Sequence, residues 1–210
     1  MSKIPVDHVL ILAIIIISSL LAVFILFKLV YKHNPICDEY YGAEIVLFHS
    51  DERYKKRVWR FNLIEDFKNK KSNGKINERL ELKVIVGEFS ENTQEIVKHA
   101  ANHNFESIII IAGPNVFCED RTEIYTLLDK YNDVKYFILP ERPTKHFMIF
   151  NNTHLYVEKP HRHTETRGSV GIKKCNRKLL NIYNIAFNKI LTHAKPLTKE
   201  DVLNQQCYKE

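Results

Sequence analysis

The most constraining feature of this 210-residue chain is a run of 19 residues without a charge, from Val9 to Phe27. Most of these residues are Leu, Ile, Val, Phe or Ala. As an α-helix rising ~1.5 Å per residue, the run would reach ~28 Å, which is close to the thickness of a bilayer core. The sequence therefore predicts a transmembrane helix over residues 9–30, preceded by a short flank at 1–8.

A cleaved signal peptide is the alternative interpretation of this run. The run is longer than the usual ~7–15-residue apolar region of a signal peptide, and no small-x-small cleavage site follows it, so we expect an uncleaved anchor. The first flank offers the α-amino group and Lys3 against Asp7. The second flank is basic, with Lys28, Lys32, Arg53, Lys55, Lys56 and Arg57. The positive-inside rule then predicts a single-pass protein of the cell membrane whose large domain is cytoplasmic.

The rest of the chain is long enough for one domain with its own core. We expect a linker at 31–43, a cytoplasmic α/β domain at 44–194 and a polar tail at 195–210. The four cysteines are scattered and form no CxxC pair: Cys37, Cys118, Cys175 and Cys207. This usage predicts free thiols in a reducing compartment.

Strand and helix patterns alternate through most of this domain. Apolar runs and period-two patterns predict strands at 44–49, 80–86, 107–112 and 134–139. Three- and four-residue spacing predicts helices at 52–70, 91–103 and 120–131, the first with its basic residues facing out and the second with Ser90 as N-cap. This order predicts right-handed crossovers and a three-layer α/β domain with a mostly parallel sheet.

A β-hairpin and a helix complete the expected domain. The short runs 146–150 and 153–157 are separated by Asn151-Asn152, a pair suited to a tight hairpin turn. A helix follows at 176–193, and the last residues, from Pro196, are expected to be loose or weakly helical.

Basic charge suggests an anionic partner. Outside the anchor region there are 29 Lys and Arg (31 less Lys3 and Lys28) against 24 acids (25 less Asp7), a balance of +5. The excess gathers at 53–75 and 159–178, which favours a lipid headgroup, a phosphate or a nucleic acid as ligand. A solvated lysine-rich surface is the alternative. The candidate anion-binding residues are Lys145, Lys159, Arg162, Arg167, Lys173 and Lys174.

Motifs for cofactors and metals are missing from the sequence. There is no GxGxxG, GxxxxGK[ST], GxSxG, HExxH or EF-hand pattern, so we expect no cofactor. His161 and His163 would point the same way in an extended segment, as metal ligands need. Their neighbours Lys159, Arg162 and Arg167 would repel a cation, so we expect no metal there.

The order of elements from Leu80 to Leu191, with His146 beginning a short strand, resembles one half of a phospholipase D superfamily domain. In that family an HxKxxxxD motif begins a strand and leads to a GSxN turn. Its histidine attacks phosphorus, and its lysine holds a phosphate oxygen. Here Met148 replaces the lysine, Thr153 replaces the aspartate, and Pro160-His161 replaces Gly-Ser. The resemblance therefore implies a retained fold with lost catalysis.

Two functions follow from this resemblance. The first is a non-enzymatic membrane protein whose phospholipase D-like domain acts as a binding, scaffold or regulatory module. The second is a membrane-tethered phosphodiesterase or nuclease that dimerises, because the family builds its site from two histidine motifs. It would use His146 from each chain, with Lys145 or Lys159 in place of the lost lysine. A structural role for His146, packed beside Pro143, is the plain alternative.

Overall fold

The computed structural model describes residues 42–114, 121–158 and 168–204. The chain divides into two units, residues 1–42 and 43–210, and the described residues belong almost entirely to the second. The membrane segment expected at 9–30 lies outside the described residues. Within them, no helix combines the length and the apolar character that crossing a bilayer requires.

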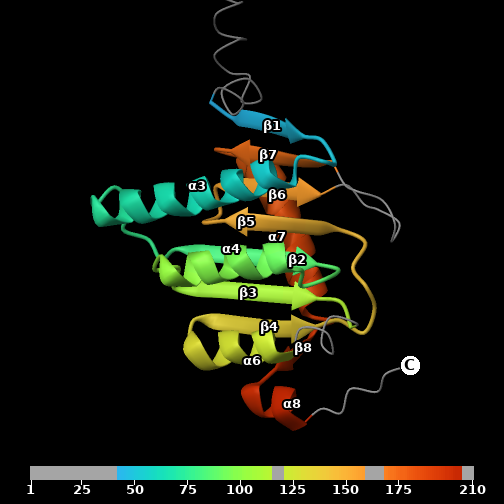
Figure 1. Ribbon diagram of the computed structural model, residues 1–210. Coiled ribbons are helices and arrows are strands. Elements are labelled where there is room, and N and C mark those ends of the chain that lie inside the picture. Colours follow the sequence, from blue (N-terminus) through green and yellow to red (C-terminus); the bar gives the residue numbers. More distant parts are fainter. Residues whose placement is uncertain (1–41, 115–120, 159–167, 205–210) are drawn as a thin grey trace, which may run out of the picture. The chain divides into compact units, whose positions relative to one another are not determined.

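An eight-stranded sheet forms the centre of the second unit, in the order β1-β7-β6-β5-β2-β3-β4-β8 (Figure 1). The strands are β1 Glu44–Phe48, β2 Glu81–Val86, β3 Ser107–Ala112, β4 Val134–Ile138, β5 His146–Phe150, β6 His154–Glu158, β7 Ser169–Lys173 and β8 Lys195–Leu197. The helices of the described residues are α3 Arg53–Ser72, α4 Glu91–Asn102, α6 Arg121–Lys130, α7 Arg177–Leu191 and α8 Lys199–Asn204.

The prediction of a mostly parallel sheet is wrong. Only β2–β3 and β3–β4 pair in parallel, and the other five pairings are antiparallel. The strand–helix alternation predicts that β1 joins the parallel strands, but β5, β6 and β7 lie between β1 and β2. The sequence does not predict β7, because this strand lies in a basic segment and contains Gly171, which weakens a strand pattern.

The predicted hairpin turn at Asn151-Asn152 is confirmed. Both residues have positive φ, 46° and 48°, as a type I′ turn requires. The turn joins β5 to β6 as an antiparallel pair, and β5 also pairs antiparallel with β2. The hairpin therefore inserts beside the parallel strands and brings the start of β5 to the end of β2.

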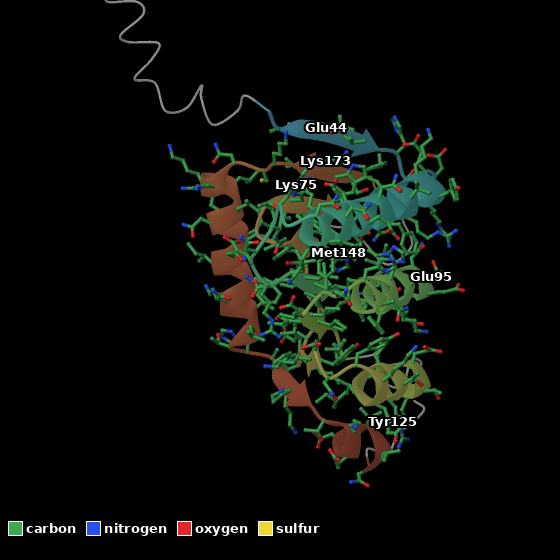
Figure 2. All side chains as sticks on the ribbon, turned by 90° about the vertical axis from the view of Figure 1, so that its left-hand side faces the viewer. Glu44, Lys75, Glu95, Tyr125, Met148 and Lys173 are labelled. Atoms are coloured by element: carbon green, nitrogen blue, oxygen red, sulfur yellow. The ribbon has the colours of Figure 1, made fainter. Side chains whose placement is uncertain are left out.

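Helices cover both faces of the sheet (Figures 1 and 2). One core lies under α3, α4 and α6 and contains Leu82, Ile110 and Phe150. The other lies under α7 and contains Phe147 and Phe187. The expected polar tail begins instead with β8, which pairs with β4, and continues into α8.

Candidate functional site

The start of β5 lies at the edge of the sheet where the parallel strands end. β2 and β3 finish at Val86 and Ala112, and β5 runs antiparallel to β2, so His146 is at the same edge. In α/β folds this is the edge where ligands bind. Gly87 follows β2, and a Cβ atom on it would lie only 2.7 Å from His146 Nε2. The backbone at the end of β2 therefore lies directly against the imidazole.

His146 is buried, with 5% of its surface exposed. Its Nε2 lies 3.1 Å from the carbonyl oxygen of Pro143, and because a carbonyl only accepts, Nε2 carries a hydrogen. In the neutral ring the lone pair is then on Nδ1, which lies 3.7 Å from Oε2 of Glu158. The Nδ1 side of the ring thus faces a carboxylate.

Further polar side chains connect His146 to helix α3. The Tyr156 hydroxyl donates to Oε1 of Glu158 at 3.5 Å. The guanidinium of Arg60 lies 4.6 Å from the centre of the Tyr156 ring, and Arg60 Nε donates to the carbonyl oxygen of Lys56. We call Lys56, Arg60, His146, Tyr156 and Glu158 the His146 cluster.

The cluster buries two cations. Lys56 is 7% exposed and Arg60 is 4% exposed. Burial lowers the pKa of Lys56 from its usual range, Arg60 lowers it further, and the negative charge of Glu158 opposes both effects. The Lys56 ammonium donates to the carbonyl oxygen of Ser50 at 3.1 Å. The cluster therefore places two buried cations in the same group as one carboxylate, that of Glu158.

Tyr156 contributes a neutral hydroxyl to the cluster. Burial raises the pKa of Tyr156 to about 12, so the phenol stays protonated at neutral pH. Its ring packs between Trp59 and Arg60, at 6.1 Å from the indole and 4.6 Å from the guanidinium. The tyrosine therefore holds the Arg60 guanidinium in place against the sheet.

Sequence reasoning missed Lys56 and Arg60 as site residues. The helical stripe predicts that the basic residues of this helix face out, whereas Lys56 and Arg60 face the sheet. Their spacing of four residues, on either side of Trp59, is the signal that places them on the buried face.

The two motif positions after His146 carry no charge in the structure either. Met148 (Figure 2) is 3% exposed in the α3-facing core. It is the partner of Tyr156 in the pairing of β5 with β6. Thr153 follows the hairpin turn at the far end of β5, where its hydroxyl lies 2.8 Å from Nδ1 of His154. Neither residue can offset the charge of a phosphoryl group beside His146.

The expected anion-binding residues do not all come together. Lys145 is exposed just before β5. Lys173 pairs with Glu44 at 3.1 Å (Figure 2), and Lys174 is exposed after β7. Because β5 and β7 run in the same direction, Lys145 is separated from the other two by the length of a strand, about 14 Å. The remaining candidates and two histidines lie outside the described residues: Lys159, Arg162, Arg167, His161 and His163.

Comparisons with known proteins find likeness in structure only. No family model matches the chain, and no curated protein matches it in sequence. Nuc from Salmonella typhimurium, a phospholipase D family member, is 12% identical with a TM-score of 0.53, over 75% of this chain and 99% of Nuc. NucT from Helicobacter pylori is 11% identical with a TM-score of 0.54, over 74% of this chain and all of NucT.

A third solved structure matches over more of the chain. TrmBL2, an archaeal chromatin protein with a novel mode of DNA binding, is 12% identical with a TM-score of 0.52, over 91% of this chain and 67% of TrmBL2. At these identities the likeness shows the fold and no activity. Nuc and NucT match over 99% and 100% of their own lengths. The described domain has a phospholipase D-like fold.

Proposed function

We propose that the protein is a phospholipase D-like binding module that has lost phosphoryl transfer and binds a phosphate-bearing ligand at the His146 cluster. The observation that carries this proposal is the state of His146. The imidazole is 5% exposed, with one nitrogen on the Pro143 carbonyl, and Met148 takes the position of the lysine. A histidine nucleophile needs an open path to phosphorus and a cation beside it.

Binding without catalysis is supported by the cations of α3. Arg60 is buried against Tyr156, and Lys56 is buried one turn away on the same helix, where the charge of Glu158 acts on it. A guanidinium pairs well with a phosphate through two parallel hydrogen bonds. A phosphodiester, from nucleic acid or from a lipid headgroup, fits this chemistry. A scaffold or regulatory role would follow from such binding.

Ligand retention by the full chain tests this proposal. A short single-stranded DNA and vesicles containing phosphatidylglycerol are separate arms, each with inorganic phosphate as competitor. We expect one arm to show retention that falls steeply between low and physiological salt. Arg60→Gln should weaken it at least about tenfold, as expected for losing a charge-assisted pair. Lys189→Gln on the exposed face of α7 removes the same charge and should change little.

Two results would end this proposal. One is no retention of either ligand at low salt. The other is equal weakening by Arg60→Gln and Lys189→Gln, which would mean that only net charge matters. Circular dichroism shows whether Arg60→Gln is folded, and Lys56→Gln is a second variant of the same cluster. Together they separate the loss of a ligand contact from the loss of the fold. The predicted role of Arg162 and Arg167, outside the described residues, is tested by charge reversal at both in the same assay.

A dimeric phosphodiesterase is the second candidate. Coverage of Nuc and NucT over their full lengths supports it, since the family needs two histidine motifs for one site. It would require two His146 side chains in one cleft and a replacement lysine, for which Lys145 is exposed at the start of β5. The buried imidazole favours the binding module over this candidate.

Attachment to a membrane is a further part of the proposal and rests on sequence alone. The uncharged run Val9–Phe27 and the basic flank after it support attachment with the domain on the cytoplasmic side. Protease added to intact cells should leave the domain uncut, and carbonate washing should leave the chain in the membrane fraction. Digestion of the domain would reverse the orientation, and release by carbonate would exclude the anchor.

A further inference from the structure

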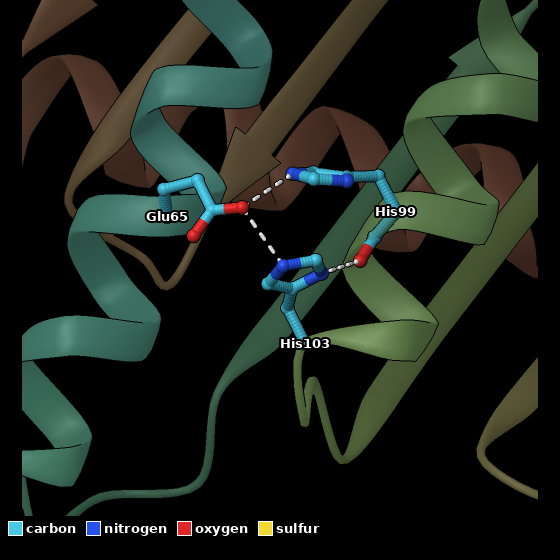
Figure 3. Close-up of side chains that lie close together, drawn as sticks. All are labelled: Glu65, His99 and His103. Atoms are coloured by element: carbon cyan, nitrogen blue, oxygen red, sulfur yellow. Dashed lines mark hydrogen bonds and ion pairs between the residues drawn. The ribbon is translucent and has the colours of Figure 1, made fainter.

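Three side chains from two neighbouring helices converge on one point (Figure 3). Glu65 belongs to α3, whereas His99 and His103 lie one turn apart at the end of α4. One carboxylate oxygen and a nitrogen of each ring all lie within 4.8 Å of one another. Two histidines four residues apart on a helix present their rings on the same face, as helical metal sites require.

The hydrogen bonds of His103 leave a lone pair at this point. Its Nδ1 lies 2.7 Å from the carbonyl oxygen of His99, and because a carbonyl only accepts, Nδ1 carries a hydrogen. In the neutral ring, Nε2 is then a bare acceptor, and it lies 2.8 Å from Oε1 of Glu65. Two acceptors at this distance repel each other unless a proton or a metal cation lies between them.

His99 directs a second nitrogen at the same carboxylate oxygen. Its Nε2 lies 3.2 Å from Oε1 of Glu65. This nitrogen is buried, and in its present orientation it forms no hydrogen bond with any described residue. Burial lowers the pKa of His99, the neighbouring His103 lowers it further, and the carboxylate of Glu65 opposes both effects. A neutral imidazole is the form that binds metals.

The distances suit a small divalent ion. Tetrahedral zinc sites have metal–ligand bonds of about 2.0–2.2 Å to His and Glu, which separates the ligand atoms by about 3.3 Å. The two observed separations to Oε1 of Glu65, 2.8 and 3.2 Å, need a shift of only a few tenths of an ångström, and all three ligand atoms lie within 4.8 Å of one another. Two imidazoles and one carboxylate favour zinc over magnesium or calcium, which prefer oxygen ligands.

Among the described residues, a hollow gives an ion access to the ring of His103, and the nearest cation lies at the Glu65 oxygen that is not needed as a ligand. A hollow of about 490 Å³ borders His103, so water and ions can reach the ring. The nearest described cation on Glu65 is Lys68, whose ammonium lies 3.9 Å from the other oxygen, Oε2. Phe61 packs edge-on against His99 at 4.3 Å between ring centres and fixes that ring.

We propose that Glu65, His99 and His103 bind one Zn²⁺ ion, with water in the fourth coordination position. The bound ion links α3 to α4, two neighbouring helices on the same face of the sheet (Figure 1). This site is separate from the His146 cluster and does not depend on the function proposed for it.

Zinc titration of the full chain, stripped with EDTA, tests this site by calorimetry and by thermal unfolding. We expect one tight equivalent and a rise in Tm of about 5 °C at saturating zinc. His99→Gln, His103→Gln and Glu65→Gln should each weaken that equivalent at least about tenfold. His193→Gln removes an exposed histidine of the same chain and should leave it intact.

Two outcomes would overturn the zinc site. Wild-type affinity in all three cluster variants would place any bound zinc elsewhere. No rise in Tm with zinc, together with a lower Tm of the variants in EDTA, would mean that the cluster is only an ion pair between the helices. Circular dichroism of each variant in EDTA confirms that the compared proteins are folded.

Discussion

At the scale of single residues, Gly171 shows how closely α3 packs on the sheet. A Cβ atom there would lie 2.6 Å from the indole of Trp59, which itself packs against Phe48 and Tyr156. Gly171→Ala removes some chain entropy of the unfolded state, but the rigid ring cannot move away, so the clash dominates. We expect a loss of about 1–3 kcal/mol in the free energy of unfolding, measured by urea denaturation.

A second substitution identifies the cause of this loss. In a Trp59→Leu background the clash is absent, so Gly171→Ala should cost much less there than in the wild type. Equal stability of Gly171→Ala and wild type would show that the helix does not lie as closely on β7 as the distances indicate.

Burial of His154 makes stability depend on pH. Its pKa is held down at about 4 from an ordinary value of 6.5, and its ring packs on Phe67. Between these two values the unfolded chain binds a proton that the folded protein does not, so stability falls as pH drops from 6.5 to 4. The loss from this group reaches about 3 kcal/mol at most. Above pH 6.5 it contributes no pH dependence.

The measurement is urea denaturation at pH 7 and pH 5 for wild type and His154→Phe. Phenylalanine keeps the ring contact and removes the titrating group, so the variant should lose less stability at pH 5. His99, whose pKa is also lowered, titrates equally in both proteins and cancels in the comparison. The same pH dependence in both would disprove a buried neutral His154.

At the scale of elements, two helix N-caps differ in a testable way. Asn176 Oδ1 accepts the main-chain N–H of Lys178 at 2.6 Å at the start of α7. Ser90, at the N-cap position the sequence predicts for α4, makes no side-chain hydrogen bond to the helix backbone. Asn176→Ala should cost about 1 kcal/mol in unfolding free energy, and Ser90→Ala clearly less. Equal costs by urea denaturation would contradict these cap assignments.

Local sequence patterns predict most of the helices and strands, but they do not predict which strands pair with one another. The strands at 107–112 and 146–150 and the Asn151-Asn152 turn follow directly from apolar runs and turn chemistry. The position of β1 does not, because the partner of an edge strand depends on contacts with β7, far along the chain. β8 has only three residues, so period two cannot show in it.

The candidate sites show the same division between local and distant information. The motif identifies His146 in the sequence. The burial of its ring cannot be predicted in this way, because it depends on Gly87 and Pro143, which only the fold brings against the ring. The spacing of His99 and His103 on a predicted helix is visible in the sequence. Their third partner, Glu65, lies on another helix, and only the packing of α3 on α4 brings it near.

At the scale of the whole molecule, the domain has a phospholipase D-like fold, and we propose that this fold is retained without phosphoryl transfer. The fold places His146 at the edge of the sheet where the parallel strands end, and the carboxylate of Glu158 lies 3.7 Å from its ring. The position that should hold a phosphate oxygen carries the thioether of Met148. Loss of a transition-state cation of this kind costs several kcal/mol of catalysis.

Hydrolysis of bis(p-nitrophenyl) phosphate by the full chain tests this claim most directly. Wild type, His146→Ala and His193→Ala are compared, the last as a control histidine on the surface. A domain without phosphoryl transfer should give the same background rate of nitrophenol release in all three proteins. Turnover by wild type and His193→Ala that His146→Ala abolishes would contradict it and establish a phosphodiesterase.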